Sequence, residues 1–163
     1  IAGVHDFRSW SDIVTAHGIS GPDIVEGIAA GWADVARIGG VLLLAQMSSS
    51  GNLLKADYTD EVIATGRGSP NVIGFIGNGS SAEEVAALRA KVGDSQMIWT
   101  PGVNLAVGDG EMGQRYGHPK EAVLAGSDAI IVGSGIHGAD SRQEAAAEYA
   151  RESFEALCER EGQ

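Results

Sequence analysis

The sequence contains one cysteine, Cys158, and no long apolar run. A lone cysteine cannot form a disulfide within the chain, which is typical of a reducing compartment such as the cytoplasm. The longest uninterrupted apolar segment, residues 41–45, is far shorter than the roughly 20 residues that cross a bilayer. The first residues show no charged and then apolar leader. We therefore expect a cytoplasmic protein with no membrane partner.

Basic residues are also scarce. The chain has 11 lysines and arginines against 22 aspartates and glutamates, which gives a formal net charge of −11. A field of this sign repels nucleic acids and anionic membranes, and it argues against both as partners. An anionic ligand would have to be held by local donors, because the overall field opposes it.

Metal-site and hydrolase patterns are missing as well. The four histidines lie at positions 5, 17, 118 and 137, without the spacing of a metal site. His17 is the best placed of them to face a ligand, although a structural role is favoured. The serine run at residues 48–50 is not set in the strand–nucleophile–helix turn of a hydrolase. We predict no metal and no cofactor.

Short apolar runs alternate with amphipathic segments along the whole chain. The predicted strands are residues 12–17, 41–46, 71–76, 96–99 and 129–133. They lack polar–apolar alternation, as expected for parallel strands covered on both faces. Helices are predicted at residues 22–36, 57–65 and 119–124, and after the capping boxes that begin at Ser81 and Ser141. The sequence therefore predicts a single α/β domain over residues 1–163.

The last predicted helix has a core-facing stripe. Four residues recur at three- and four-residue steps in it, and three more widen the stripe: Ala146, Tyr149, Ser153 and Leu157, with Ala150, Phe154 and Ala156. Charged residues fill the opposite face, which is typical of a helix that packs on a core and exposes its back.

The number of strand–helix units bears on the architecture. A complete (β/α)8 barrel needs roughly 250 residues, and this chain holds about five units. Residues 1–11 resemble the end of a helix and its turn. We therefore predict the C-terminal part of a TIM barrel. A complete five-stranded doubly wound sheet is the alternative.

Glycine-rich segments follow the last two predicted strands. Thr100-Pro101-Gly102 follows one, Gly133-Ser134-Gly135 follows the other, and Gly113-Gln114-Arg115-Tyr116 lies between them. Phosphate sites of barrels are built where backbone amides and a few side chains meet at the strand ends. The pattern predicts a phosphorylated metabolite as ligand.

Several segments together resemble orotidine 5′-monophosphate (OMP) decarboxylase, in the form found in fungi and animals. Residues 2–4 and 10–18 resemble the family's fourth-strand region, residues 41–53 its fifth, and Val72–Ile76 its sixth. Residues 100–103, 113–116 and 127–133 complete the set in the same order. The resemblance covers essentially the whole chain. It implies a carboxy-lyase of pyrimidine biosynthesis, which converts OMP to UMP and carbon dioxide without a cofactor.

The resemblance assigns roles to individual residues. It implies that Ser48 contacts the pyrimidine ring, which suits a hydroxyl that faces an imide edge. It implies that Gln114 and Tyr116 hydrogen-bond the substrate phosphate as neutral donors. Pro101 would fix the start of a lid over residues 102–113.

The turn at residues 133–135 would complete the phosphate cradle with its backbone amides, starting at Gly133. Ser134 stands where the family has an arginine that grips the phosphate. Serine offers one neutral donor in place of a charged fork, so we expect phosphate affinity to fall by about an order of magnitude or more. Gln46 and Thr15 replace the family's usual glutamate and asparagine, and we give these changes little weight.

The family's decarboxylating lysines and aspartates have no counterpart here. The resemblance places them in an Asp-x-Lys-x-x-Asp motif upstream of the Ala-Gly-Val segment, and this chain begins one residue before that segment. Lys55, Lys91 and Lys120 lie in no such motif. We therefore assign no catalytic residue and predict that the 163-residue chain alone is inactive.

Three functions remain open. The first is an OMP decarboxylase segment that binds a pyrimidine nucleotide (OMP or UMP) and forms a homodimer or associates with the missing part of the barrel. The second is a non-catalytic nucleotide-binding or assembly module, since missing strands would leave open sheet edges. The third is another phosphate-binding barrel enzyme that acts on a sugar phosphate, which the match around Ser48 disfavours.

Overall fold

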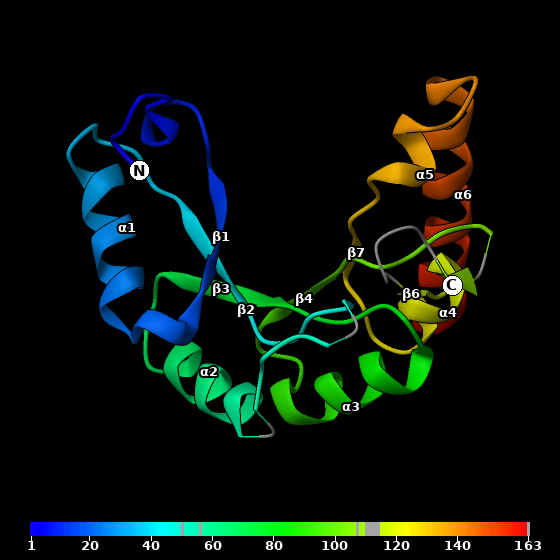
Figure 1. Ribbon diagram of the computed structural model, residues 1–163, viewed down its shortest axis with the longest axis horizontal. Coiled ribbons are helices and arrows are strands. Elements are labelled where there is room, and N and C mark those ends of the chain that lie inside the picture. Colours follow the sequence, from blue (N-terminus) through cyan, green and yellow to red (C-terminus); the bar gives the residue numbers. More distant parts are fainter. Residues whose placement is uncertain (50, 56, 107, 110–114, 163) are drawn as a thin grey trace. The chain divides into compact units, whose positions relative to one another are not determined.

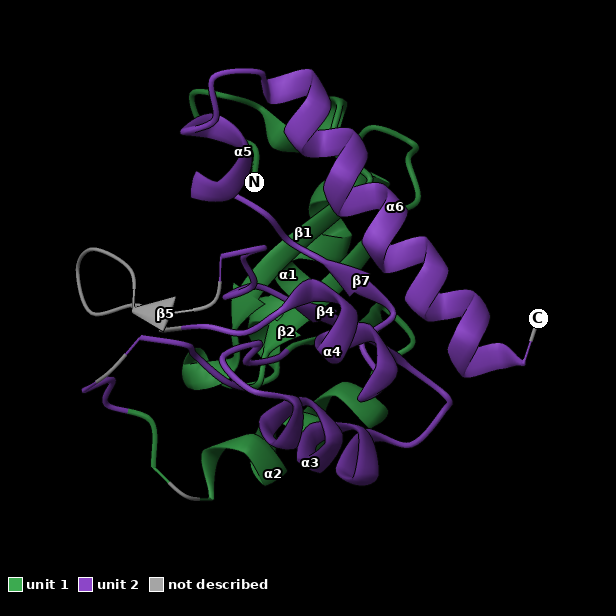
Figure 2. Cartoon of the chain, turned by 90° about the vertical axis from the view of Figure 1, so that its right-hand side faces the viewer, with its two compact units in different colours: residues 1–45, 54–76 green, residues 46–53, 77–163 purple. Residues whose placement is uncertain are grey.

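The computed structural model describes residues 1–49, 51–55, 57–106, 108–109 and 115–162. Helices and strands alternate along the chain, as predicted (Figure 1). The chain forms two compact units, coloured separately in Figure 2. Unit 1 comprises residues 1–45 and 54–76, and unit 2 comprises residues 46–53 and 77–163. Each unit is an α/β assembly with parallel strands, so the α/β prediction is confirmed.

Unit 1 is built on three parallel strands in the order β1-β2-β3. Its elements are η1 (Phe7–Ser9), β1 (Ile13–His17), η2 (Gly18–Ser20), α1 (Asp23–Ala33), β2 (Gly40–Leu44), α2 (Tyr58–Arg67) and β3 (Val72–Ile76). In the register, Thr15 lies beside Leu42, and Leu43 lies beside Phe75. All three strands lie within two residues of their predicted bounds.

Apolar burial holds unit 1 together. In β2, Val41, Leu42 and Leu43 are at most 1% exposed. Phe75 of β3 is fully buried, and Trp32 of α1 is also buried. The indole nitrogen of Trp32 donates to the carbonyl oxygen of Ser11 at 2.8 Å, so its polar atom is satisfied.

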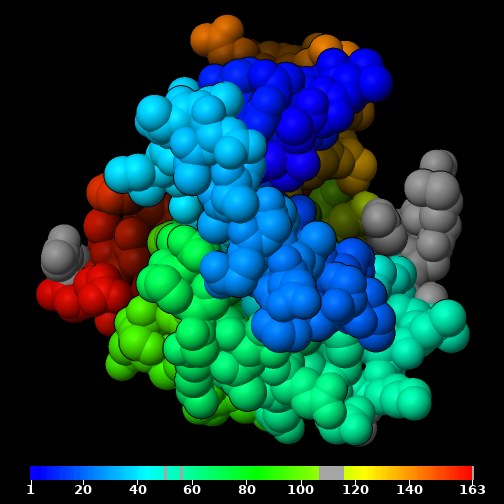
Figure 3. All heavy atoms as spheres, turned by 90° about the vertical axis from the view of Figure 1, so that its left-hand side faces the viewer, coloured from blue at the N-terminus to red at the C-terminus, as the bar shows by residue number. Residues whose placement is uncertain are grey.

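The strand β1 departs from the expectation of burial on both faces. Ala16 is its one buried residue, and Ile13 is 38% exposed. Residues 1–11 also differ from the expected helix end, because they hold a turn and the short 3-10 helix η1. Figure 3 shows this N-terminal segment, in dark blue, at the surface. The prediction of a strand here is confirmed, but the prediction of its burial is wrong.

Unit 2 contains shorter strands and more helix. Its elements are α3 (Ala82–Val92), β4 (Met97–Thr100), β5 (Gly108–Asp109), β6 (Arg115–Tyr116), α4 (Pro119–Leu124), β7 (Ala129–Ile130), α5 (Ser134–His137) and α6 (Arg142–Glu161). β4 and β7 are parallel, with Trp99 beside Ala129. β5 and β6 form an antiparallel pair. Both predicted helix N-caps are present, since Ser81 Oγ and Ser141 Oγ each accept a backbone hydrogen bond from the third residue that follows.

Polar side chains tie the elements of unit 2 together. Arg89 of α3 donates to the carbonyl oxygens of Gly93 at 2.6 Å and Gly126 at 2.7 Å, and it pairs with Asp128. The fully buried Ser127 hydroxyl donates to Thr100 Oγ1 at 2.7 Å. These bonds connect α3, β4 and the start of β7.

Two predictions for unit 2 need correction. The last strand ends at Ile130 rather than at residue 133, and the short helix α5 begins at Ser134. On α6, Tyr149 and Ala156 are buried as predicted. Phe154 is 66% exposed, however, and Ala146 and Ala150 are also exposed. The core-facing stripe is therefore narrower than its spacing suggested. Among the described residues, every helix is too short or too polar to cross a membrane.

Candidate functional site

Two residues of the predicted phosphate site meet in unit 2. The hydroxyl oxygens of Tyr116 and Ser134 lie 3.2 Å apart, on the exposed surface, and either can donate to the other. Tyr116 ends β6, whereas Ser134 begins α5. Two hydroxyls from segments 18 residues apart therefore converge on one point.

The turn after β7 positions Ser134. The amide of Ile131 donates to the carbonyl of Thr100 at 3.0 Å, which keeps the chain beside β4 just beyond the strand. The carbonyl of Gly133 then accepts from the amides of Ile136 and His137. The amides of Ser134 and Gly135 precede these first helical donors, so they have no acceptor within the helix. Hydroxyl and amide donors therefore occur together at this turn.

A backbone junction positions Tyr116. The next residue, Gly117, donates its amide hydrogen to the carbonyls of Gly102 at 3.0 Å and Gly79 at 3.1 Å. Its own carbonyl accepts from the amide of Asn104 at 2.9 Å. A Cβ added at Gly117 would lie 2.3 Å from the Gly79 oxygen, which no side chain can tolerate. This close contact between Gly117 and Gly79 fixes the backbone next to Tyr116.

Pro101 is half-buried at the end of β4. Its carbonyl accepts a hydrogen bond from the amide of Gly79 at 2.9 Å. The segment from residue 102 onward therefore leaves a fixed point, and its role as the start of a lid stays a prediction. Residues 107 and 110–113 of that predicted lid lie outside the described residues, and so does the predicted phosphate ligand Gln114.

The segment that carries Ser48 also belongs to unit 2. It is attached there through Gln46, whose side-chain oxygen accepts from the amide of Asn78 at 3.0 Å and whose nitrogen donates to Glu84 at 3.4 Å. Ser48 lies two residues further on and is half-buried. Among the described members of the predicted site, the side-chain hydrogen bond joins Tyr116 to Ser134 and does not include Ser48.

The lysines lie apart from this site. Lys120 of α4 forms an ion pair with Glu159 of α6 at 2.9 Å, and the hydrogen bond and charge of that carboxylate raise the pKa of Lys120. Lys55 and Lys91 are exposed. Across the described ranges, no group of three or more His, Cys, Asp or Glu side chains could hold a metal ion.

Sequence reasoning assigned Tyr149 to core packing and missed its polar contacts. Its hydroxyl donates to Asn104 Oδ1 and accepts from the amide of Leu105, both at 3.1 Å. The sequence did contain a signal for these contacts, namely a tyrosine on a helix face predicted to be buried. A buried phenol usually finds a hydrogen-bond partner.

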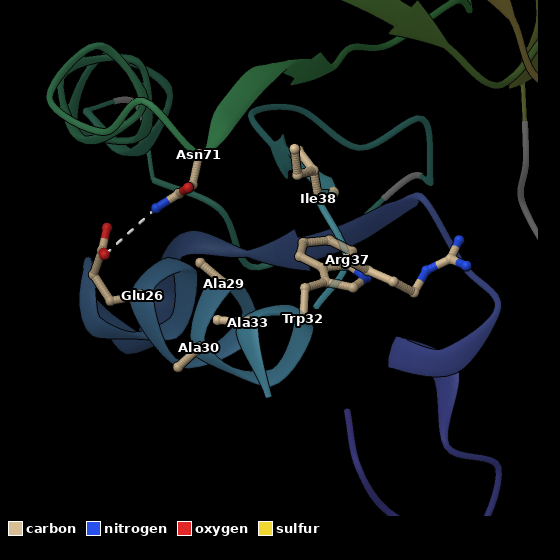
Figure 4. Close-up of a pocket in the computed structure, with 9 residues that line it drawn as sticks. Glu26, Ala29, Ala30, Trp32, Ala33, Arg37, Ile38 and Asn71 are labelled. Atoms are coloured by element: carbon tan, nitrogen blue, oxygen red, sulfur yellow. Dashed lines mark hydrogen bonds between the residues drawn. The ribbon is translucent and has the colours of Figure 1, made fainter. Parts of the chain in front are cut away.

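Two hollows in unit 1 contain none of the predicted site residues. One, of about 450 Å³, is lined by α1, the loop before β2 and Asn71, and is drawn in Figure 4. Its rim carries Glu26, which accepts a hydrogen bond from Asn71 at 3.5 Å. The other, of about 480 Å³, is lined by residues that include Thr15 and His17. His17 thus faces a hollow, although no ligand chemistry converges there.

Comparison with known proteins gives a consistent result. Residues 1–149 match the model of the orotidine 5′-phosphate decarboxylase / HUMPS family. The chain is 43% identical to orotidine 5′-phosphate decarboxylase of Schizophyllum commune over 143 residues, covering 85% of this chain and 50% of that protein. It is 36% identical to uridine 5′-monophosphate synthase of Bos taurus, covering 97% of this chain and 31% of that protein. The chain spans about half the length of its fungal relatives.

Solved structures show the same relationship. The fold resembles crystalline orotidine 5′-phosphate decarboxylase from Pyrococcus horikoshii OT3, with a TM-score of 0.68 and 27% identity over 91% of this chain and 64% of that one. The enzyme from Sulfolobus solfataricus gives a TM-score of 0.67 at 21% identity, which supports the fold alone. The prediction of a barrel-type α/β fold is thereby confirmed. With family model, fungal relatives and fold in agreement, the chain belongs to the orotidine 5′-phosphate decarboxylase / HUMPS family.

Proposed function

We propose that this chain is the part of an OMP decarboxylase that holds the substrate's phosphate and pyrimidine. The observation that carries the proposal is the meeting of the Tyr116 and Ser134 hydroxyls beside the first-turn amides of α5. Donors gathered at the end of a parallel strand are suited to an anionic ligand. Family membership makes a pyrimidine nucleotide the expected ligand.

The chemistry of the pair suits a phosphate in an acidic protein. Without a ligand, Tyr116 and Ser134 bond each other at 3.2 Å. A phosphate dianion offers stronger acceptors, so the hydroxyl that donates to its neighbour would turn its proton to a phosphate oxygen, and the other hydroxyl would donate a second bond. The exchange loses a neutral hydrogen bond worth about 1 kcal/mol and gains two to an anion, each worth about 1.5–3 kcal/mol. The exchange therefore favours phosphate binding by neutral donors.

Three further contacts belong to the proposal. The hydroxyl of Ser48 would hydrogen-bond the edge of the pyrimidine ring. Gln114 would be a third neutral donor that hydrogen-bonds the phosphate. Pro101, whose carbonyl is anchored by Gly79, would hold the start of a lid over the nucleotide. The amide of Gly133 would extend the phosphate cradle.

The decarboxylating groups are proposed to come from sequence outside these 163 residues. The exposure of Lys55 and Lys91 and the ion pair of Lys120 with Glu159 on α6 support this assignment. The active enzyme would be a cytoplasmic homodimer or an association of this chain with the rest of the barrel. The single domain over residues 1–163 is part of the same proposal.

A titration with three ligands tests the binding function. We expect the chain to bind UMP, to bind uridine at least tenfold more weakly because it lacks the phosphate, and to bind ribulose 5-phosphate more weakly because it lacks the pyrimidine. Isothermal calorimetry gives the three dissociation constants. Equal affinity for UMP and uridine would contradict the phosphate site, and a preference for ribulose 5-phosphate would favour a sugar-phosphate enzyme.

An activity assay tests whether the decarboxylating groups come from outside these 163 residues. We expect no release of carbon dioxide from OMP by the 163-residue chain, measured as loss of orotate absorbance. Turnover that disappears in the variant Ser48→Ala would show that the chain contains its own catalytic groups and would overturn this part of the proposal.

A second candidate function, assembly, is favoured by β1. This strand pairs with β2 in unit 1, and Ile13 on it is 38% exposed. A sheet edge with exposed apolar side chains can pair with another chain. Sedimentation equilibrium should then show self-association that weakens in the variant Ile13→Lys. A monomer at every concentration would rule the assembly function out.

A further inference from the structure

The base of the predicted lid is held by a buried phenol. The side chain of Tyr149, on α6, is 3% exposed. Its hydroxyl donates to Asn104 Oδ1 and accepts from the amide of Leu105, each at 3.1 Å. Both the donor and the acceptor of the phenol are therefore used on one short segment, residues 104–106, which we call the loop base.

The loop base is connected to the segment that carries Tyr116. Asn104 Oδ1 also accepts from the amide of Ala106 at 3.0 Å, and the Asn104 amide donates to the carbonyl of Gly117 at 2.9 Å. Gly117 directly follows Tyr116. The phenol of Tyr149 thus fixes the segment on which the first phosphate-binding hydroxyl depends.

The same phenol contacts the turn that carries the second hydroxyl. A Cβ added at Gly135 would lie 2.1 Å from the Tyr149 hydroxyl oxygen and 2.9 Å from its ring carbon Cζ. The backbone beside Ser134 therefore rests directly on Tyr149, which requires glycine at position 135. Figure 2 shows α5 and α6 together in unit 2.

We propose that Tyr149 is a positioning residue for phosphate binding. Its hydroxyl sets the distance between the loop base and the Ser134 turn, and it does so from the interior while Tyr116 and Ser134 face solvent. The inference rests on the proposed function, because it assumes that these two hydroxyls bind phosphate. Loss of the phenol hydroxyl leaves the Leu105 amide without its hydrogen-bond acceptor. It also loosens the segment that carries Tyr116, one member of the Tyr116–Ser134 pair.

The variant Tyr149→Phe separates positioning from packing, because it keeps the ring and removes one oxygen. We expect UMP affinity to fall by about five- to tenfold and uridine affinity to stay within about twofold, measured by calorimetry. Ser153→Ala is the matched control. It also removes a hydroxyl from α6, one that bonds the carbonyl of Tyr149 at 2.7 Å, and it should leave the UMP-to-uridine ratio unchanged.

A second variant approaches the same contact from the other side. Gly135→Ala places a methyl group against the Tyr149 hydroxyl and should also lower UMP affinity. Its effect should be smaller when it is combined with Tyr149→Phe, since the oxygen that it meets is gone. This coupling is a double-mutant cycle, and a role in packing alone would move stability without changing the ratio of the two affinities.

The outcomes separate the two proposals. If the wild-type chain binds UMP and uridine equally, the proposed phosphate site fails and the role of Tyr149 fails with it. If the wild-type chain prefers UMP but Tyr149→Phe and Gly135→Ala keep the same preference, the phosphate site stands and the positioning role is overturned. A reduced preference in both variants, with the Ser153→Ala ratio unchanged, supports it.

Discussion

In unit 1, β2 and β3 are buried by apolar side chains, and Trp32 and Phe75 fill the space beneath the helices. Unit 2 also has an apolar core, with Leu88 and Ile98 fully buried, but buried or partly buried polar atoms connect its elements as well, as in the contacts of Arg89, Ser127 and Tyr149. The predicted site residues all belong to unit 2. The contrast teaches that the part of the chain with the proposed binding site adds directional bonds, which fix angles as well as distances, to its apolar packing.

The largest effect is expected in the apolar core of unit 1. Phe75→Ala removes a fully buried ring and should lower the free energy of unfolding by about 3–5 kcal/mol. Phe154→Ala is the matched control in unit 2, where the ring is 66% exposed, and should change it by less than about 0.5 kcal/mol. Urea denaturation followed by circular dichroism measures both. Equal losses would show that the burial contrast is wrong.

The next effect tests the polar connections of unit 2. Arg89→Met keeps the aliphatic stem but removes the donor to the carbonyl of Gly126 and one of the partners of Asp128, and should cost about 3 kcal/mol. Arg151→Met removes an arginine from α6 that pairs with glutamates at the surface, and should change the unfolding midpoint very little. If both variants change the unfolding midpoint by the same amount, the Arg89 contacts contribute no more stability than a surface ion pair.

Glycine-to-alanine substitutions should change the stability of the fold in opposite directions in the two units. Gly117→Ala drives a methyl group onto the Gly79 carbonyl and should destabilise the fold by about 2 kcal/mol. Gly27→Ala lies in the exposed interior of α1, with open space around its Cβ, and should stabilise it by up to about 1 kcal/mol. Thermal melts of the two variants should move in opposite directions. A shift of the same sign would refute the backbone junction at Gly117.

The smallest effect concerns the site itself. Ser134→Arg replaces an exposed neutral donor with a charged fork and should tighten UMP binding by about tenfold, or about 1.4 kcal/mol. Uridine affinity should not change, and calorimetry at two salt concentrations should show a steeper salt dependence for the variant. Equal tightening for uridine would mean that residue 134 does not face the phosphate.

Sequence patterns predicted the strands well where apolar runs were long. β2 and β3 match because continuous burial leaves a clear apolar run. The pattern gave too much length to β7, because residues 131–133 are apolar or glycine but continue as a turn into α5. Exposure of β1 could not be predicted, since burial depends on which elements cover a strand and not on its own composition.

The site was predicted in part. Tyr116 and Ser134 do meet, which follows from the family's motifs rather than from local propensity. The resemblance also places Ser48 and Gln114 at the site, and their roles stay predictions. Tyr149 was missed because helical spacing reports which face is buried, whereas the target of a buried hydroxyl is set by tertiary contacts such as the one with Asn104.

Positions 134 and 135 are neighbours with separable tasks. Residue 134 is exposed, so a mutation there can change the charge offered to a ligand while the backbone path stays the same. Residue 135 rests on the Tyr149 phenol, so a mutation there changes the path and adds no charge. Under the proposed function, a single substitution at position 134 would therefore raise or lower the affinity for phosphate without rebuilding the turn.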